Sequence, residues 1–308
     1  MELLKKKFVA TNEIYDQEKS SLLYFLFPSS FCANIDSRLK KSSVIHKKLN
    51  NQHVYCIDGF FDLFEADVLA KFSAESIFSD LSYGTLEAAA LGEKPSMTLN
   101  AQERWNFFIQ PPNPIKVIYS LFSHLARVLD IEISTMPWML FNGIAGSCAV
   151  IANKVLSVKQ ESTIKGKHKD VDPTKKLAFE TPCLYGDKPF TGSQINGQTG
   201  YPYYLTVMVY SNASNFNENY EMGTSFFFQD GKMIQAICRN MRIVIFEGDI
   251  FHSIGASNFS EDIDTWRVSY VFKIILNPKS PTQNIVDLLM EFFKNQNYFN
   301  SNQSYSNF

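Results

Sequence analysis

Short segments rich in β-branched and aromatic residues fill the second half of the chain, and turn residues separate several of them. The segments lie at 138–141, 147–158, 203–210, 224–229, 233–238, 241–246 and 267–276. Asp230-Gly231 and Glu247-Gly248-Asp249 are clear turn sequences between them. Short strands that follow one another through tight turns favour an antiparallel sandwich or barrel. The sequence therefore predicts a mainly β fold for this part of the chain.

Helices are predicted on either side of this β-rich region. Asp62 and Glu65 have the spacing of a capping box, so a helix should begin there, after a strand at 53–57. A second helix should follow the proline-rich break at 111–114, and a third should follow Pro281. Apolar residues recur at helical spacing in all three, namely Phe64, Val68, Leu69 and Phe72; Val117, Ile118, Leu121, Phe122, Leu125 and Val128; and Ile285, Leu288, Leu289, Phe292 and Phe293.

The composition excludes several classes of protein. The 308 residues suit one large domain with embellishments, or two small ones, and a hydrophobic content of 45% is ample for a core. A net charge of −2 gives no basic field, so we expect no nucleic-acid partner. Five scattered cysteines without a Cys-x-x-Cys pair suit a reducing compartment. Because no apolar run reaches about 18 residues, we expect a soluble, cytoplasmic protein with no membrane partner, and a short organellar presequence stays open.

A His-x-Asp pair and a distant histidine form the candidate metal site. In an extended strand His168 and Asp170 share one face, while the neighbouring Lys167 and Lys169 share the other and are expected to be a solvated face. His252 follows a strand and a Glu-Gly-Asp turn, which can place it opposite His168. Two imidazoles and one carboxylate are the ligand set of non-haem Fe(II) oxygenases, which leave one face of the metal open. His168 alone would read equally well as an ordinary histidine, and Asp172 is an alternative carboxylate.

Arg267 begins an apolar strand, and Ser269 shares its strand face. A charge in such a strand needs a buried partner, because an unpaired buried charge is costly. A guanidinium matches a carboxylate in two-point fashion, as a dicarboxylic co-substrate such as 2-oxoglutarate would require. The alternative is an ordinary salt bridge to Asp262 or Asp264.

Several motifs in the same region carry a family resemblance. A strand of the form Leu-Thr-x-x-x-Tyr-x-Asn runs from Leu205 to Asn212, and a degraded Gly-Gly-x-Thr-x-Phe hairpin lies at 222–226. An Arg-x-Val-x-Phe-x-Gly-Asp-x-x-His segment spans 242–252, and Arg-x-Ser closes the set at 267–269. With His-x-Asp before them, these motifs resemble the Fe(II)/2-oxoglutarate-dependent dioxygenase superfamily, especially its prolyl 4-hydroxylase-like branch.

The resemblance implies a fold and a division of labour among residues. The fold would be mainly β with flanking helices, a double-stranded β-helix or jelly roll. Fe(II) would be held by His168, Asp170 and His252. The co-substrate 2-oxoglutarate would bind Arg267 through its distal carboxylate, and O₂ would be the oxidant. The residues expected to assist co-substrate binding are Tyr210, Ser269 and Thr206.

The implied domain boundaries and activity complete the prediction. We expect an N-terminal extension at 1–50, the jelly-roll domain at 51–280, and a C-terminal helix with a disordered tail at 281–308. The long loop at 171–202, which is rich in glycine and proline, would close as a lid over a small, anionic substrate. The activity would be hydroxylation, desaturation or oxidative ring closure of an amino-acid-like or specialised metabolite, with release of succinate and CO₂. A peptidyl, prolyl-type hydroxylase and a non-catalytic metal-binding jelly roll are the alternatives, and the oligomeric state stays open.

Overall fold

The computed structural model describes residues 34–75, 78–80, 96–99, 112–135, 150–155, 167–170, 196–212, 217–218, 221–256 and 267–295. The helices are α3 (Ile35–Lys41), α4 (Leu63–Glu75), α7 (Asn113–Val128) and α10 (Ile285–Asn295). The strands are β1 (Ser43–Leu49), β2 (Gln52–Asp58), β3 (Phe78–Asp80), β4 (Ser96–Leu99), β5 (Ile131–Thr135), β6 (Val150–Val155), β7 (Tyr203–Tyr210), β8 (Thr224–Phe227), β9 (Met233–Ala236), β10 (Ile243–Glu247), β11 (Phe251–Ile254) and β12 (Arg267–Pro278). Within these residues no helix is long and apolar enough to span a membrane.

The strands form two antiparallel sheets. The larger sheet has the order β1-β2-β10-β7-β12-β6-β4-β3, with β5 also paired to β12, and the smaller has the order β11-β8-β9. His168 extends the smaller sheet through an antiparallel bridge to His252. From β6 onward the chain passes back and forth between the two sheets. Strands β6, β7, β10 and β12 lie in the larger sheet, and His168, then β8 and β9, then β11 lie in the smaller sheet between them. This alternation is a jelly roll, so the predicted fold class is confirmed.

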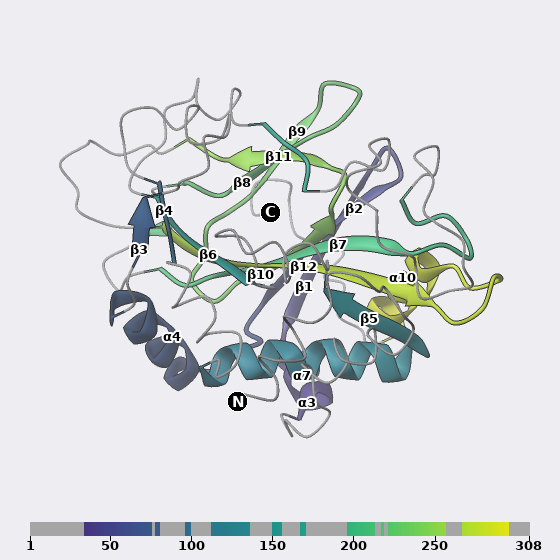
Figure 1. Ribbon diagram of the computed structural model, residues 1–308, viewed down its shortest axis with the longest axis horizontal. Coiled ribbons are helices and arrows are strands. Elements are labelled where there is room, and N and C mark those ends of the chain that lie inside the picture. The colour runs from purple at the N-terminus through teal and green to yellow at the C-terminus, as the bar shows by residue number, and fades with distance from the viewer. Residues whose placement is uncertain are drawn as a thin grey trace, which may run out of the picture.

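Strand β7 lies at the centre of the larger sheet and is buried on both faces. All eight of its residues are buried, and their side chains alternate between two cores. Leu205, Val207 and Val209 pack on the side of the helices, whereas Met208 and Tyr210 pack toward the smaller sheet. Figure 1 shows the helix α7 running along one face of the larger sheet, with the smaller sheet across the other face. The second core, between the two sheets, is the interior in which the candidate site lies.

The helix α4 begins at the predicted capping box. The backbone N–H of Glu65 donates to Oδ1 of Asp62 over 2.8 Å, and the N–H of Asp62 donates to Oε2 of Glu65 over 3.0 Å. Arg38 of α3 also donates to both carboxylate oxygens of Glu65, over 2.7 and 2.9 Å. Reciprocal capping satisfies N–H groups that a helix start leaves unpaired. The other two predicted helices also form, as α7 and α10.

Strands β1 and β2 form a hairpin across the expected domain boundary at residue 50. Leu49 pairs with Gln52, so the loop between them has two residues. Asn50 and Asn51 have φ of 51° and 64°, the left-handed values of a type I′ turn, which asparagine tolerates. Residues 35–49, expected within an N-terminal extension, therefore contribute α3 and an edge strand to the described fold.

Some predictions concern residues outside the described part. These are the predicted strand at 138–141, the ends of the segment predicted at 147–158, residues 171–195 of the predicted lid, and the tail after 295. The end of the predicted lid is described and is joined to the sheet. Oδ1 of Asn196 accepts from the N–H of Tyr204 over 2.8 Å, and its Nδ2 donates to Asp249 over 3.2 Å. The lid itself stays a prediction.

Candidate metal centre and carboxylate pocket

The structure brings His168, Asp170 and His252 together between the two sheets. Two backbone hydrogen bonds, of 3.0 and 2.8 Å, pair His168 with His252, so their side chains project from the same face of the smaller sheet. Asp170 lies two residues further along and shares that face. One ligand atom from each residue lies within 4.8 Å of the other two. Among the described residues this is the one group of three or more histidine, cysteine or acidic side chains with metal-ligand spacing.

Neighbouring groups orient two of these ligands. Nδ1 of His252 lies 3.0 Å from the carbonyl oxygen of Ile250. A proton on Nδ1 completes this hydrogen bond and leaves the Nε2 lone pair for a metal. The Nε2 atom in turn lies 3.5 Å from Oδ2 of Asp170, which accepts a 2.6 Å hydrogen bond from Oγ1 of Thr206. The donor set, two imidazole nitrogens and one carboxylate oxygen with oriented partners, fits Fe(II).

Arg267 forms a second, deeper part of the site. Its side chain is only 2% exposed, and its guanidinium carbon lies 5.0 Å from the centre of the Tyr210 ring. It donates to Oγ of Ser269 over 3.2 Å, to Oγ1 of Thr224 over 3.3 Å and to Sδ of Met208 over 3.7 Å. Its Nε has no hydrogen-bond partner among the described residues. All of these acceptors are neutral.

Among the described residues, the other ionisable groups beside Arg267 do not supply a counter-charge. Burial raises the pKa of Tyr210 to about 12, so its phenol keeps its proton and can donate a hydrogen bond. The phenol lies 2.7 Å from Oγ1 of Thr224. Burial likewise raises the pKa of the Cys238 thiol to about 11, so that group is also neutral near pH 7. Within the described part of the chain Arg267 has no acidic ion-pair partner, and the alternatives Asp262 and Asp264 lie outside that part.

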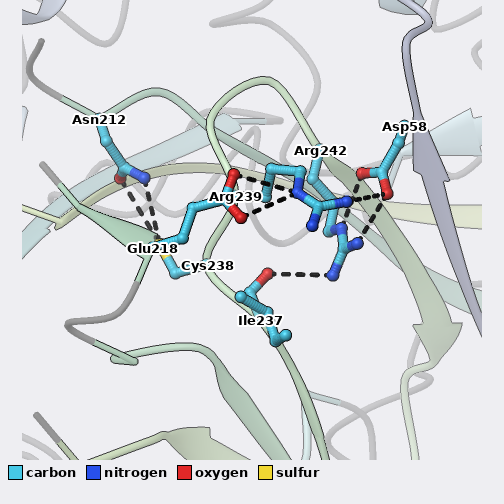
Figure 2. Close-up of polar contacts among 7 residues, drawn as sticks. All are labelled: Asp58, Asn212, Glu218, Ile237, Cys238, Arg239 and Arg242. Carbon is cyan, nitrogen blue, oxygen red and sulfur yellow. Dashed lines mark hydrogen bonds and ion pairs between the residues drawn. The ribbon is translucent and has the colours of Figure 1, made fainter. Parts of the chain in front are cut away.

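A second buried arginine shows how this protein neutralises such a charge internally. Arg242 is fully buried and donates from Nε and Nη2 to the two carboxylate oxygens of Asp58, over 2.7 and 2.6 Å. Figure 2 shows this two-point pair, with Arg239 joining Asp58 to Glu218. Arg267 is buried to a similar degree but has hydroxyls and a thioether where Arg242 has a carboxylate. Because a buried cation without a counter-charge is costly, the Arg267 pocket is suited to an incoming anion.

The predicted site residues fall into two groups. Arg267, Tyr210 and Ser269 lie together, and Thr224 joins them as a buried hydroxyl that contacts both Arg267 and Tyr210. The sequence contained Thr224 within the degraded hairpin motif, but no feature of the motif indicated its partners. Thr206 lies instead at the metal end, where its hydroxyl contacts Asp170.

Lys167 and Lys169 lie on the outer face of the smaller sheet, away from the candidate ligands. The ammonium of Lys167 lies 5.0 Å from the ring centre of Phe227 and 4.7 Å from that of Phe251, and the ammonium of Lys169 lies 4.7 Å from Phe251. Phe251 is 40% exposed, so these contacts are at the surface. The expectation of a solvated lysine face is consistent with this arrangement.

Comparisons with known proteins found similarity to solved structures. No protein-family model matches it, and neither does a curated protein. It is similar to the non-haem α-ketoglutarate-dependent epimerase SnoN from nogalamycin biosynthesis, with 10% identity, 79% of this chain and 81% of that chain covered, and a TM-score of 0.39. A Pseudomonas putida prolyl-4-hydroxylase is 8% identical, with 80% and 97% covered and a TM-score of 0.35. A Trichoplax adhaerens prolyl hydroxylase, in complex with a hypoxia-inducible-factor peptide fragment, is 10% identical, with 88% and 96% covered and a TM-score of 0.38.

Proposed function

We propose that this chain is an Fe(II)- and 2-oxoglutarate-dependent oxygenase. The observation that carries the proposal is the buried Arg267, which has no carboxylate partner among the described residues and shares the inter-sheet interior with the His168-Asp170-His252 triad. A metal site alone would suit many proteins. A metal site beside a cationic pocket that accepts a carboxylate is what a 2-oxo dicarboxylate requires.

The spacing of the two parts is consistent with that co-substrate. Thr206 contacts the triad and Tyr210 contacts the Arg267 pocket, and four residues of β7 span about 13 Å. A five-carbon dicarboxylate is roughly 7 Å long, and a metal–oxygen bond and a hydrogen bond add about 2 and 3 Å. The two lengths are comparable, which supports one molecule reaching from the metal to Arg267.

The chain's own residues would bind and orient the reactants. Arg267 and Tyr210 would donate hydrogen bonds to the distal carboxylate, with Ser269 and Thr224 holding the guanidinium and the phenol in place. When bound, iron supplies the activation of O₂ that couples release of succinate and CO₂ to oxidation of an unactivated C–H bond. The buried walls of the pocket, including Met208 and Phe226, would exclude water from that chemistry.

We propose a small substrate, an amino-acid-like or specialised metabolite that is hydroxylated, desaturated or cyclised. The support is enclosure: the candidate ligands lie between two sheets, and His252 is only 7% exposed. A peptide substrate would need an open groove beside the metal.

The test is coupled turnover. The protein would be incubated with Fe(II), 2-oxoglutarate and O₂, either with a metabolite library or with a proline-containing peptide library, and succinate and substrate masses would be measured. Succinate formation that depends on a metabolite is the expected result. A mass gain only on peptides would replace the small substrate with a peptidyl one. Absence of Fe(II) binding by the wild-type protein would refute the proposal as a whole.

A further inference from the structure

The hydroxyl of Thr206 contacts the metal triad, although the family resemblance placed this residue with the co-substrate. Its Oγ1 donates to Oδ2 of Asp170 over 2.6 Å, and that oxygen also lies 3.5 Å from Nε2 of His252. We propose that Thr206 is a positioning residue of the metal centre, which fixes the orientation of the Asp170 carboxylate. This inference deepens the proposed function and rests on it.

The location of Thr206 suits that role. It is 1% exposed and lies on β7, the strand flanked by β10 and β12 in the larger sheet. A side chain on a central strand is held in place more firmly than one on a loop. Asp170 lies two residues beyond the backbone bridge at His168, so that bridge fixes Asp170 less directly than His168. Thr206 therefore connects the carboxylate ligand to a strand that is paired on both sides in the larger sheet.

The hydrogen-bond inventory of a threonine separates this role from co-substrate binding. A hydroxyl has one proton, and Thr206 donates it to Asp170, so it has no second proton for an oxygen of 2-oxoglutarate. The carboxylate of Asp170 is itself largely buried, with 5% of its side chain exposed. Losing the donor would remove this hydrogen bond from Oδ2 and would hold the carboxylate less firmly in its orientation. Loss of a hydrogen-bond partner of a metal ligand typically weakens metal affinity by about 10- to 100-fold.

The experiment compares Thr206→Val, Thr206→Ser and Thr224→Val with the wild-type protein. Valine keeps the shape and the β-branching of threonine but removes the hydroxyl, and serine keeps the hydroxyl. Thr224 gives the matched control, because it is a buried threonine at the Arg267 end of the same interior. Two affinities would be measured without turnover: that of Co(II) for the protein alone, from its absorption spectrum, and that of 2-oxoglutarate for the Co(II)-loaded protein, by calorimetry.

We expect Thr206→Val to bind Co(II) about 10- to 100-fold more weakly and Thr206→Ser to restore the wild-type affinity. Thr224→Val should bind Co(II) like the wild type and bind 2-oxoglutarate more weakly. Near-ultraviolet circular dichroism would check that each variant is folded. If Thr206→Val misfolds, Thr206→Ala, which also removes the hydroxyl, would take its place with the same expected loss of Co(II) affinity. Unchanged Co(II) affinity with weakened 2-oxoglutarate binding in Thr206→Val would overturn this inference and leave the proposed oxygenase intact. Failure of the wild type to bind any metal would instead refute the proposed function.

Discussion

Replacing Arg267 by methionine should weaken co-substrate binding without destabilising the free protein. In the free protein Arg267 is 2% exposed, and its guanidinium has only neutral acceptors among the described residues. Removing such a charge removes its desolvation penalty, so the melting temperature should stay constant or rise. Bound 2-oxoglutarate would lose two charge-assisted hydrogen bonds of about 1.5–3 kcal/mol each, which corresponds to a hundredfold or greater loss of affinity at about 1.4 kcal/mol per factor of ten.

The Arg242→Met variant is the internal comparison. It removes the cation that binds both oxygens of Asp58 and leaves that carboxylate with Arg239 as its charged partner in Figure 2. Breaking a buried pair in this way costs about 3–5 kcal/mol, and the remaining Arg239 contact favours the lower end of that range. At about 2–4 °C per kcal/mol for a chain of this size, the melting temperature should fall by roughly 6–12 °C.

The two variants would be compared by thermal unfolding and by calorimetric titration of 2-oxoglutarate into the Co(II)-loaded protein. The expected pattern is weak binding with an unchanged or raised melting temperature for Arg267→Met, and a lowered melting temperature for Arg242→Met. A fall of the same size in Arg267→Met would show that Arg267 already has a counter-ion within the protein, with Asp262 and Asp264 as the candidates. That result would refute the inference that the Arg267 pocket binds the carboxylate of a ligand.

Three further predictions concern the ligands, a buried carboxyl and a hairpin. His168→Ala and His252→Ala should each abolish measurable Co(II) binding; an unchanged affinity in both variants would show that the triad is wrongly assigned. Burial raises the pKa of Glu247 from 4.5 to about 8, so its contribution to stability is full below pH 4.5 and is lost as pH rises through 8. The free energy of unfolding in urea should therefore decline between pH 5 and pH 9 in the wild type and decline less in Glu247→Gln. A parallel decline in both proteins would contradict the raised pKa of Glu247. Gly223→Ala would place a Cβ against the carbonyl oxygen of Ala236, so β8 and β9 must separate and the melting temperature should fall. An unchanged melting temperature would disprove this close approach.

The sequence predicted those features that local patterns determine. The capping box at Asp62 and Glu65 located the start of α4, and the run of β-branched and aromatic residues at 203–210 defined β7 from its first residue to its last. His-x-Asp spacing put His168 and Asp170 on one face without knowledge of the partner strand. In each case the residues that decide the structure lie within a few positions of one another.

The features that the sequence did not predict depend on partners far along the chain. Strand β1 has the sequence Ser-Val-Ile-His-Lys-Lys-Leu and lies at the edge of the larger sheet. Edge strands often carry lysines, and the two lysines here hide the apolar pattern by which a strand is predicted. The contact of Thr206 with Asp170 joins residues 36 positions apart, and that of Thr224 with Arg267 joins residues 43 apart. A local sequence pattern does not indicate which hydroxyl contacts which charged group. The different roles of Thr206 and Thr224 could therefore be assigned only from the three-dimensional structure.

Strand β7 explains why the metal site and the carboxylate pocket can act on one molecule. Its inward-facing residues Thr206, Met208 and Tyr210 contact Asp170, Arg267 and Thr224 in order along a single strand. Because β10 and β12 pair with β7 on either side, the spacing of these residues cannot change without breaking the larger sheet. The ligands themselves come from the smaller sheet, so the fit between metal and Arg267 is fixed by how the two sheets pack through Phe226, Phe246 and their neighbours. The proposed co-substrate, which has a fixed length, would therefore reach both the metal and Arg267 only while that inter-sheet core remains well packed. The core would then be part of the proposed recognition of 2-oxoglutarate.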